Sequence, residues 1–516
     1  MTPTTATHEV EAKFRVHPPF EIPDLLDSRT GAAAADEPVH HELRAIYWDT
    51  SDLRLAREGI TLRHRSGEGD SHDGWHLKLP SAAARVVPDG SAVSREEIRA
   101  TGSGDAIPAE LRSLVLPWSR TAVLGPVATL VTQRTGYLLR DMNNQPLVEL
   151  TDDLVSVVNA GHVAGRFREI EVEDRGGGIA GIEAVGSLLR ASGAVGGEFV
   201  PKVVRALGPQ ASADPDPPLP SKVGLDEPAR VAVRDMLRRD VRRLIALDTS
   251  VRRDQEDAAH QMRVTARRLR SVLKTFKPLL DPQWAGSLRR ELSWLADSMS
   301  TTRDSEVLLA RLTRDLDELP EDLVIGPVRA RLEQLLKGNL ATGRESVEAT
   351  LSSERYVVLL ERLVDAGWEP FTAPAGERPT GKAIPRLVRV CWNELVDGVK
   401  RLDREDSVPE DWHEVRIEAK RLRYSCEAAA PTFGRSAQRL AKIASSLQDS
   451  LGENQDATIA ADLLRSTATQ RGGTTIAFTL GLLHAKQSEA AAAARGEFRQ
   501  QWDAARRSRS LAWLGE

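Results

Sequence analysis

Charged residues near the start of the chain recur at every second position. The segment from His8 to Phe14 reads HEVEAKF and places Glu9, Glu11 and Lys13 two residues apart. Because side chains alternate between the two faces of a strand, we expect these three charges to share one face. Two carboxylates beside a cation indicate a site for a metal and a phosphate.

Three later segments keep the same period of two. ITLRHRS supplies Arg63 and Arg65, GWHLKLP supplies Lys78, and FREIEVED supplies Glu169, Glu171 and Glu173. A half-exposed sheet with solvated charges would also show this period. Here, however, some strands offer mainly acids and others only cations. If these faces line one closed barrel, they provide oxygen ligands for a hard ion such as Mg²⁺ or Mn²⁺ beside cations for phosphate.

The elements that must position these residues form two domains, because 516 residues are too many for one compact core. Residues 1–207 show short strand-like runs between turn residues, which predicts antiparallel β-structure with a few helices. Residues 208–223 are rich in proline and predict a linker. Residues 224–516 carry long amphipathic segments, which predict an all-α bundle of eight or more helices. The fold class is therefore α+β with two domains.

The second half contains a repeat. HQMRVTARRLR at 260–270 and HEVRIEAKRLR at 413–423 fit the pattern H-x-x-R-x-x-x-[RK]-R-L-R. Each is followed at a similar distance by a matching segment, LADSMSTTRDSEV from Leu295 and LQDSLGENQDATI from Leu447. Two motifs in the same order predict duplication of a helical unit, with repeats at about 224–380 and 381–516.

The repeated helices each present a basic face. At about 100° per residue, one face of the first helix collects the residues His260, Arg263, Arg267, Arg270 and Lys274, and the second repeats it with His413, Arg416, Lys420 and Arg423. A solvated face would look the same, but its duplication favours an anion site.

Acidic residues and histidines near these basic faces should affect how an anion binds there. We expect Asp304 and Asp456 to pair with these arginines rather than to act as catalytic acids. The histidines are either satisfied bundle residues or donors to the anion. Glu427 stands where Lys274 stands in the first repeat, so binding is expected to be asymmetric.

The composition excludes several classes of protein. The 70 Lys and Arg residues against 75 Asp and Glu give a net charge of −5, which argues against a protein that coats nucleic acid. Two isolated cysteines predict neither disulfides nor a thiolate zinc site, as in a reducing cytoplasm. The first residues lack a signal-peptide pattern, and no apolar run approaches the ~18 residues of a membrane span. We therefore expect a soluble cytoplasmic protein with no membrane or nucleic-acid partner.

Residues 8–207 resemble the CYTH superfamily, the triphosphate tunnel metalloenzymes. The motifs occur in the family's order: E-x-E-x-K at 9–13, YWDTSDLRL at 47–55, L-R-x-R at 62–65, W-x-L-K at 75–78, E-x-E at 169–171, and the basic pair Lys202 and Arg205. E-x-E-x-K alone is weak evidence, whereas the ordered set is specific.

The resemblance implies an eight-stranded antiparallel barrel whose polar lumen binds a triphosphate and an Mg or Mn ion. It implies metal ligands at Glu9, Glu11, Asp152, Glu169 and Glu171, with Asp153 an equal alternative to Asp152. It implies phosphate contacts from Lys13, Arg63, Arg65, Lys78, Arg134 and Lys202. Catalysis would depend on Glu9, Glu11, Lys13 and Glu171, through metal-assisted attack of water on a phosphoanhydride.

Residues 225–505 resemble the CHAD domain, which implies that the basic faces of both repeats bind inorganic polyphosphate. The leading hypothesis is metal-dependent hydrolysis of inorganic triphosphate or polyphosphate, with the helical half retaining the polymer. One alternative is a non-catalytic polyphosphate-binding or targeting protein. Another is different chemistry in the barrel, either hydrolysis of an organic triphosphate (thiamine, nucleotide or RNA) or cyclisation of ATP.

Overall fold

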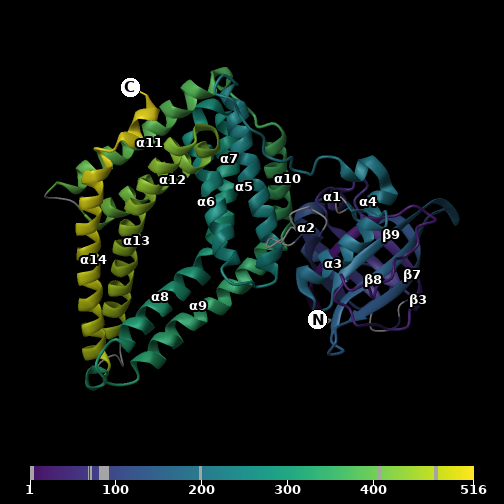
Figure 1. The fold of residues 1–516 in the computed structure, drawn as a ribbon. Helices are drawn as coiled ribbons and strands as arrows, with labels where there is room; N and C mark the ends of the chain where they lie inside the picture. Colours follow the sequence, from purple (N-terminus) through teal and green to yellow (C-terminus); the bar gives the residue numbers. More distant parts are fainter. Residues whose placement is uncertain are drawn as a thin grey trace. The chain divides into compact units, whose positions relative to one another are not determined.

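The computed structural model divides the chain into two compact units, Met1–Asp216 and Pro217–Glu516 (Figure 1). It describes residues 5–67, 69, 73–80, 92–196, 200–404, 408–469 and 475–515. Within these ranges it describes the backbone but not the side chains of residues 5, 92, 93, 300–304, 306 and 337–342.

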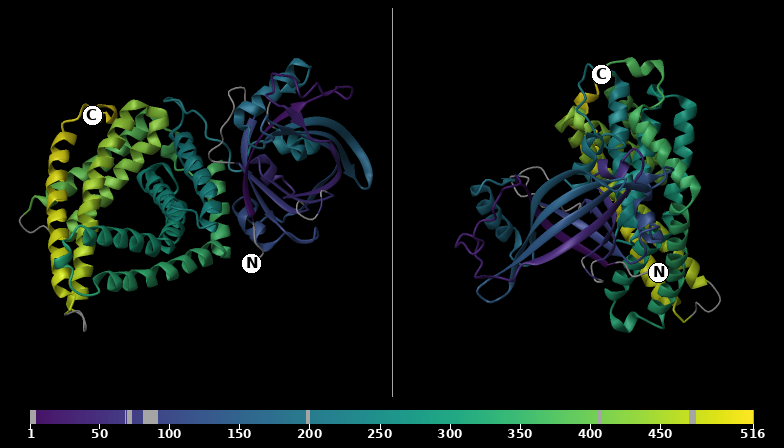
Figure 2. Two further views of the ribbon diagram at one scale, coloured as in Figure 1. Left: turned by 60° about the horizontal axis from the view of Figure 1, so that its bottom comes forward. Right: turned by 90° about the vertical axis from the view of Figure 1, so that its right-hand side faces the viewer.

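Eight antiparallel strands of the first unit close into a barrel. Their order is β1-β6-β5-β4-β3-β7-β8-β9, and pairing of β9 with β1 closes the ring (Figure 2). The strands are β1 (Thr5–Arg15), β3 (Val39–Asp49), β4 (Thr61–Ser66), β5 (Gly74–Pro80), β6 (Ala92–Ala100), β7 (Gly125–Arg140), β8 (Pro146–Asn159) and β9 (His162–Asp174). Two short strands, β2 (Ala34–Ala35) and β10 (Val195–Gly196), pair with β7 and β1. The predicted eight-stranded barrel is confirmed.

The barrel carries much of its apolar surface on the outside. Helix α3 (Gly178–Ala191) packs on β1, β8 and β9 and shares a buried cluster with side chains such as Phe14 and Val172. The packing is close, because a Cβ atom at Gly186 would lie 2.9 Å from Cζ of Phe14. Since the alternate residues of these strands point the other way, the charged positions of β1 and β9 face the interior.

A short helix, α4 (Lys202–Leu207), contributes to a second cluster. Val203 and Val204 are buried with Tyr47, Leu130 and Val155, which share the interior-facing register. This apolar group fills part of the interior, and α4 carries Lys202 at its first residue.

The predicted motif around Asp49 has a structural role. Its carboxylate accepts hydrogen bonds from the backbone N–H groups of Thr50, Leu55 and Ala56 at 2.7, 2.9 and 2.9 Å. These bonds hold the one-turn helix α1 (Arg54–Arg57) against the end of β3. The segment YWDTSDLRL therefore shapes the end of a strand, and α2 (Ala109–Ser119) packs on the helix so formed.

The second unit is helical, as predicted. The α-helices described in it are α5 (Ala229–Arg252), α6 (Ala258–Thr275), α7 (Pro282–Ser298), α8 (Ser300–Asp317), α9 (Val328–Leu351), α10 (Glu354–Trp368), α11 (Thr380–Leu402), α12 (Pro409–Phe433), α13 (Arg435–Thr469) and α14 (Ala477–Ala505). The repeated motifs lie on α6 and α12. The single long α13 corresponds to α7 and α8 of the first repeat, and it runs beside α14 as α8 runs beside α9 (Figures 1 and 2).

The proline-rich segment 208–223 contains the boundary between the two units, and each of its ends packs on one of them. Its first part forms a 3₁₀ turn, η1 (Gly208–Ser212), and Ala211 is buried in the first unit. Its later part packs on α5, where the Pro217 carbonyl accepts a 2.6 Å hydrogen bond from Arg242 and the Ser221 N–H donates to Asp235 at 2.6 Å. Extended proline-rich chain can pack in this way because it needs few backbone partners of its own.

Candidate functional site

The strand register brings the predicted charged residues onto one face. Neighbouring strands place Lys13 opposite Glu171, and Glu171 opposite Thr151. Around the ring the same face contains the pairs Asp153 and Glu169, Arg134 and Asp153, Tyr47 and Arg63, Arg63 and His76, Lys78 and Glu97, and Glu9 and Arg95. The alternating positions therefore converge inside one barrel.

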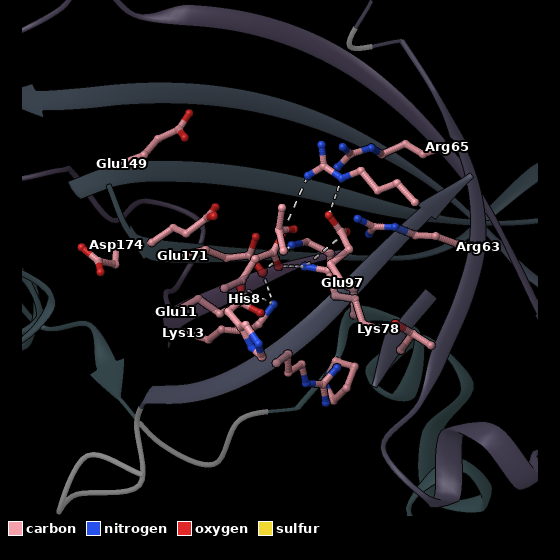
Figure 3. A pocket seen from close by; sticks show the side chains of 18 of the residues that line it. His8, Glu11, Lys13, Arg63, Arg65, Lys78, Glu97, Glu149, Glu171 and Asp174 are labelled. Carbon is pink, nitrogen blue, oxygen red and sulfur yellow. Dashed lines mark hydrogen bonds and ion pairs between the residues drawn. The ribbon is translucent and has the colours of Figure 1, made fainter. Parts of the chain in front are cut away.

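These side chains line a cavity of about 820 Å³. Figure 3 shows Glu149 and Asp174 toward one side of it and Arg63 and Arg65 toward the other, with Glu171 among the groups between them. The cavity thus has an acidic part, in which Arg175 pairs with Glu149 and Glu173, and a cationic part. The predicted residues on its lining are Glu9, Glu11, Lys13, Arg63, Arg65, Lys78, Arg134, Glu171 and Lys202.

Lys202 joins three carboxylates. Its Nζ lies 2.9 Å from Asp153, 3.0 Å from Glu169 and 2.8 Å from Glu171. Burial opposes protonation of this amine, but the three carboxylates outweigh burial and hold the Lys202 pKa well above its ordinary value. Arg134 adds a two-pronged contact to Asp153, at 2.8 and 2.7 Å.

Lys13 and Lys78 are also ion-paired in the cavity. Lys13 donates to Glu171 and lies 3.6 Å from Glu11, and Lys78 donates to Glu9. Burial raises the pKa of Glu171, but Lys13 and its other cationic neighbours prevail and hold that pKa well below its usual range. Acids and bases of the site therefore neutralise one another, and each is placed to exchange its partner for a ligand group.

Strand β6 supplies charged residues that the sequence reasoning missed. Glu97, Arg95 and Arg99 line the cavity, and Glu97 accepts hydrogen bonds from His76 at 3.0 Å and from Arg99 at 2.6 Å. Burial lowers the pKa of His76 to about 4, so this imidazole is neutral near pH 7. In the segment SREEIRA the residues Arg95, Glu97 and Arg99 show the same period of two, and this spacing could have identified them as residues of the site.

Arg63 is held over a phenol. Its guanidinium donates to Tyr47 Oη at 3.1 Å and lies 5.9 Å from the centre of that ring. Burial lowers the Arg63 pKa, but Tyr47 and Glu97 outweigh it, so the pKa is raised and the group stays cationic. The planar guanidinium is thus fixed in orientation, which suits bidentate recognition of a phosphate.

The choice of Asp152 as an interior ligand is wrong. Asp152 lies on the outer face of β8, opposite Ile170, and receives two 2.8 Å hydrogen bonds from Arg168. The next residue, Asp153, faces the interior and is fully buried. The predicted ligand Glu169 is buried beside Lys202 and also accepts a 3.1 Å hydrogen bond from Arg205.

The carboxylates of the acidic part fit a hard divalent cation. Burial, with Glu9 and Glu11 nearby, raises the Glu173 pKa to about 7, and burial raises that of Glu9. Such crowding of oxygen donors is relieved by a cation. Among the residues that the structure describes, no group of three or more acidic, His or Cys side chains is already arranged to hold a metal ion. Glu9, Glu11 and Glu171 would hold the ion on exchanging their lysine partners for it.

A second candidate site lies where α6 and α12 pack. Burial, followed by the charges of Arg416, Arg267 and Arg263, lowers the pKa of Lys420 to about 7. We call these four residues, Arg263, Arg267, Arg416 and Lys420, the central basic cluster. In the described part of the chain the buried Nε of Arg416 has no hydrogen-bond partner, and the backbone at Gly452 leaves room for its guanidinium. Cations crowded in this way attract anions.

The other predicted residues of α6 and α12 lie near this cluster. His413 is exposed and contacts Gln455 at 3.2 Å, Lys274 is exposed, and Arg423 donates to Glu427 at 2.7 Å. His260 and Arg270 are partly exposed on α6. Asp456 lies near Arg416, while the side chain of Asp304 is outside the described residues.

No described helix is long and apolar enough to pass through a bilayer.

Comparison with known proteins identifies both units. The family model of the CYTH domain matches residues 7–187, and that of the CHAD domain matches residues 228–465. A Mycobacterium tuberculosis protein described as uncharacterised is 32% identical over 515 residues, covering 95% of this chain and 94% of its own.

Two solved structures are also similar to this chain. PptA from Streptomyces chartreusis is 26% identical with a TM-score of 0.47, covering 54% of this chain and 99% of its own. The CHAD domain of Ricinus communis is 22% identical with a TM-score of 0.42, covering 54% of this chain and 94% of its own. From the two family matches and the full-length relative, the chain belongs to the proteins that join a CYTH domain, the module of the metal-dependent triphosphate tunnel enzymes, to a CHAD domain.

Proposed function

We propose that the barrel hydrolyses inorganic triphosphate or short polyphosphate with Mg²⁺ or Mn²⁺, and that the helical unit binds inorganic polyphosphate. The observation that carries the first part is the polarised cavity, with Arg63 and Arg65 at one side and acidic side chains at the other. A polyanion and a cation can occupy it together.

The lining favours an inorganic substrate over an organic one. The described residues around the cavity include no aliphatic side chain apart from Pro201. The ring side chains among them are Tyr47, whose phenol is covered by Arg63, and the polar imidazoles of His8 and His41. A nucleobase or a thiamine ring needs apolar or stacking surface. Phosphate oxygens need cations and N–H donors, which the lining supplies.

The chain's own residues orient the substrate and stabilise its charge. Lys13, Arg63 and Lys78 would exchange carboxylate or phenol partners for phosphate oxygens, with Arg65 beside them. They would place positive charge where negative charge develops during phosphoryl transfer. The bound cation would supply Lewis acidity and an acidified water. Neutral His76 lies opposite Arg63 on the neighbouring strand and is held by Glu97.

Phosphate release tests this function. The purified full chain is expected to release phosphate from tripolyphosphate with Mg²⁺ or Mn²⁺, to lose that activity in a chelator, and to regain it on adding metal. ATP, thiamine triphosphate and triphosphate-ended RNA are expected to be poorer substrates. Turnover of an organic triphosphate in preference would reassign the substrate. Binding of triphosphate without turnover of any of them would leave a binding protein.

The second part of the proposal follows from the central basic cluster. Four cations share a half-buried space, and burial together with the charges of the arginines lowers the pKa of Lys420. A polyphosphate carries one negative charge per unit along its length and would relieve that repulsion. Binding should therefore weaken steeply with salt, by analogy with other polyanions.

Polyphosphate binding should depend on pH through Lys420. With its pKa near 7, this amine is protonated below pH 7 and mostly neutral above it. Because the polyanion favours the protonated form, affinity should fall as pH rises through 7, by up to about tenfold per unit. Binding assays in a chelator from pH 6 to 8.5 check this.

Lys420→Arg is the matched variant, because an arginine stays charged throughout this range. Its affinity should be nearly independent of pH. If the variant and the natural chain show the same slope, Lys420 is not the titrating group.

A further inference from the structure

Corresponding positions of the two repeats differ in charge. Counted from the histidine of each motif, Arg268 corresponds to Arg421 and Lys274 to Glu427, and Lys442 lies within one residue of the position of Arg289. In the structure, three of these six residues lie together at each of two locations beside the contact of α6 with α12. The first location is built from Arg421, Lys274 and Arg289, and the second from Arg268, Glu427 and Lys442.

The first location is strongly cationic. Arg421 reaches from α12 to α6, where its Nε donates to Thr275 at 3.2 Å and its Nη1 donates to Glu394. Lys274 lies close enough for burial and the charge of Arg421 to lower its pKa. Arg289 of α7 completes the group, and its buried Nε has no hydrogen-bond partner among the described residues.

Arg270 ties this location to the central basic cluster. Burial and the charges of Arg270 and Arg421 lower the pKa of Arg289, so the three guanidinium groups lie near one another. Arg263, Arg267, Arg270 and Lys274 lie on successive turns of one face of α6. The cationic row is thus continuous from the central basic cluster to Lys274.

The second location is neutralised. Glu427 accepts a hydrogen bond from Arg268 and a 2.7 Å hydrogen bond from Arg423, and Arg268 also donates to Asp240 at 3.1 Å. Arg268, Glu427 and Lys442 line a cavity of about 460 Å³. The space for a ligand is therefore present here, but two carboxylates face its cations where the first location has one.

We propose that polyphosphate extends from the central basic cluster to one side only, over Arg270, Lys274, Arg289 and Arg421, and that Glu427 excludes it from the corresponding place in the second repeat. This inference rests on the proposed polyphosphate binding by the helical unit. It adds Arg289 and Arg421 to the binding residues and gives the polymer a single direction of exit. The duplicated fold would otherwise offer two equivalent paths.

A charge exchange tests the proposal on the full chain. Binding of long-chain inorganic polyphosphate is measured in a chelator, over a series of salt concentrations. Lys274→Glu should weaken binding about tenfold and lower the salt slope by about one to two. Glu427→Lys should strengthen binding by a similar factor. The double variant Lys274→Glu/Glu427→Lys, whose net charge is that of the natural chain, should bind within about threefold of it.

The outcomes separate this inference from the function on which it rests. A double variant that binds no better than Lys274→Glu would overturn the one-sided path. Failure of the natural chain to bind polyphosphate would instead overturn the proposed function. If Glu427→Lys does not fold, as judged by its thermal unfolding, Glu427→Gln replaces it. That variant should strengthen binding about threefold, and unchanged affinity would contradict the exclusion by Glu427.

Discussion

Arg63→Ala should lower kcat/KM for tripolyphosphate by about 10²- to 10³-fold, the usual cost of losing a preorganised charged donor. The guanidinium is held by Tyr47 in the cavity, so its orientation is fixed before substrate arrives. Its removal takes away a cation where charge develops on the transferring phosphoryl group. Initial rates of phosphate release at several substrate concentrations measure the effect.

Two further variants serve as controls for Arg63→Ala. Arg44→Ala removes an exposed arginine from the outer face of β3 and should leave kcat/KM within about twofold. Arg63→Lys keeps the charge but loses the planar fork, so it should recover only part of the activity. Full activity in Arg63→Ala, with a normal thermal unfolding curve, would remove Arg63 from the site.

The second large effect is expected in the helical unit. Arg263→Glu together with Arg416→Glu should abolish detectable binding of polyphosphate, a loss of at least about 10³-fold by analogy with other polyanions. Each change replaces an attraction by a repulsion within the same cluster, and Arg416 has a buried Nε with no hydrogen-bond partner in the described structure. Titration of labelled polyphosphate into the full chain in a chelator measures it.

Its control has the same change in net charge. Arg378→Glu together with Arg507→Glu alters two exposed arginines, one before α11 and one after α14. This variant should bind within about threefold of the natural chain, because distant exposed charges are screened. Equal losses in both double variants would mean that the overall field of the protein, not the cluster, attracts the polymer.

Much of the barrel was predictable because its strands alternate cleanly. In β1 and β9 the charged positions alternate with apolar residues that pack under α3, so each strand has one possible orientation. In the segments around Arg63 and Lys78, charged and apolar residues alternate in the same way. Once the ring closes, alternation alone brings these positions to one interior.

The cavity-lining residues of β6 were not predicted, because charged residues lie on both faces of this strand. Glu96 points outward between Arg95 and Glu97, which line the cavity, so hydrophobic periodicity is weak there. The prediction that Asp152 faces the interior was wrong for a related reason, since Asp153 follows it directly. Adjacent acids satisfy either register, and only the pairing of Asp153 with Glu169 decides which one faces inward.

The helical site was predictable along each helix but not between helices. The spacing of Arg263 and Arg267 on α6 already defines one face. Arg421 lies off the predicted face of α12, and its role depends on reaching Thr275 in the other repeat. Such contacts join residues far apart in sequence, so a helical period cannot reveal them.

The position of Lys202 affects how the barrel can be isolated. The CYTH match ends at residue 187, inside α3, whereas Lys202 lies on α4. A truncated fragment ending at the family boundary would keep Asp153, Glu169 and Glu171 but lose the ammonium group that contacts all three. Asp153 and Glu171 would keep Arg134 and Lys13, but Glu169 would lose both cations described at it, Lys202 and Arg205. A buried carboxylate that has lost its cationic partners is strongly destabilising. A recombinant version of this module should therefore extend at least through the buried Ala211.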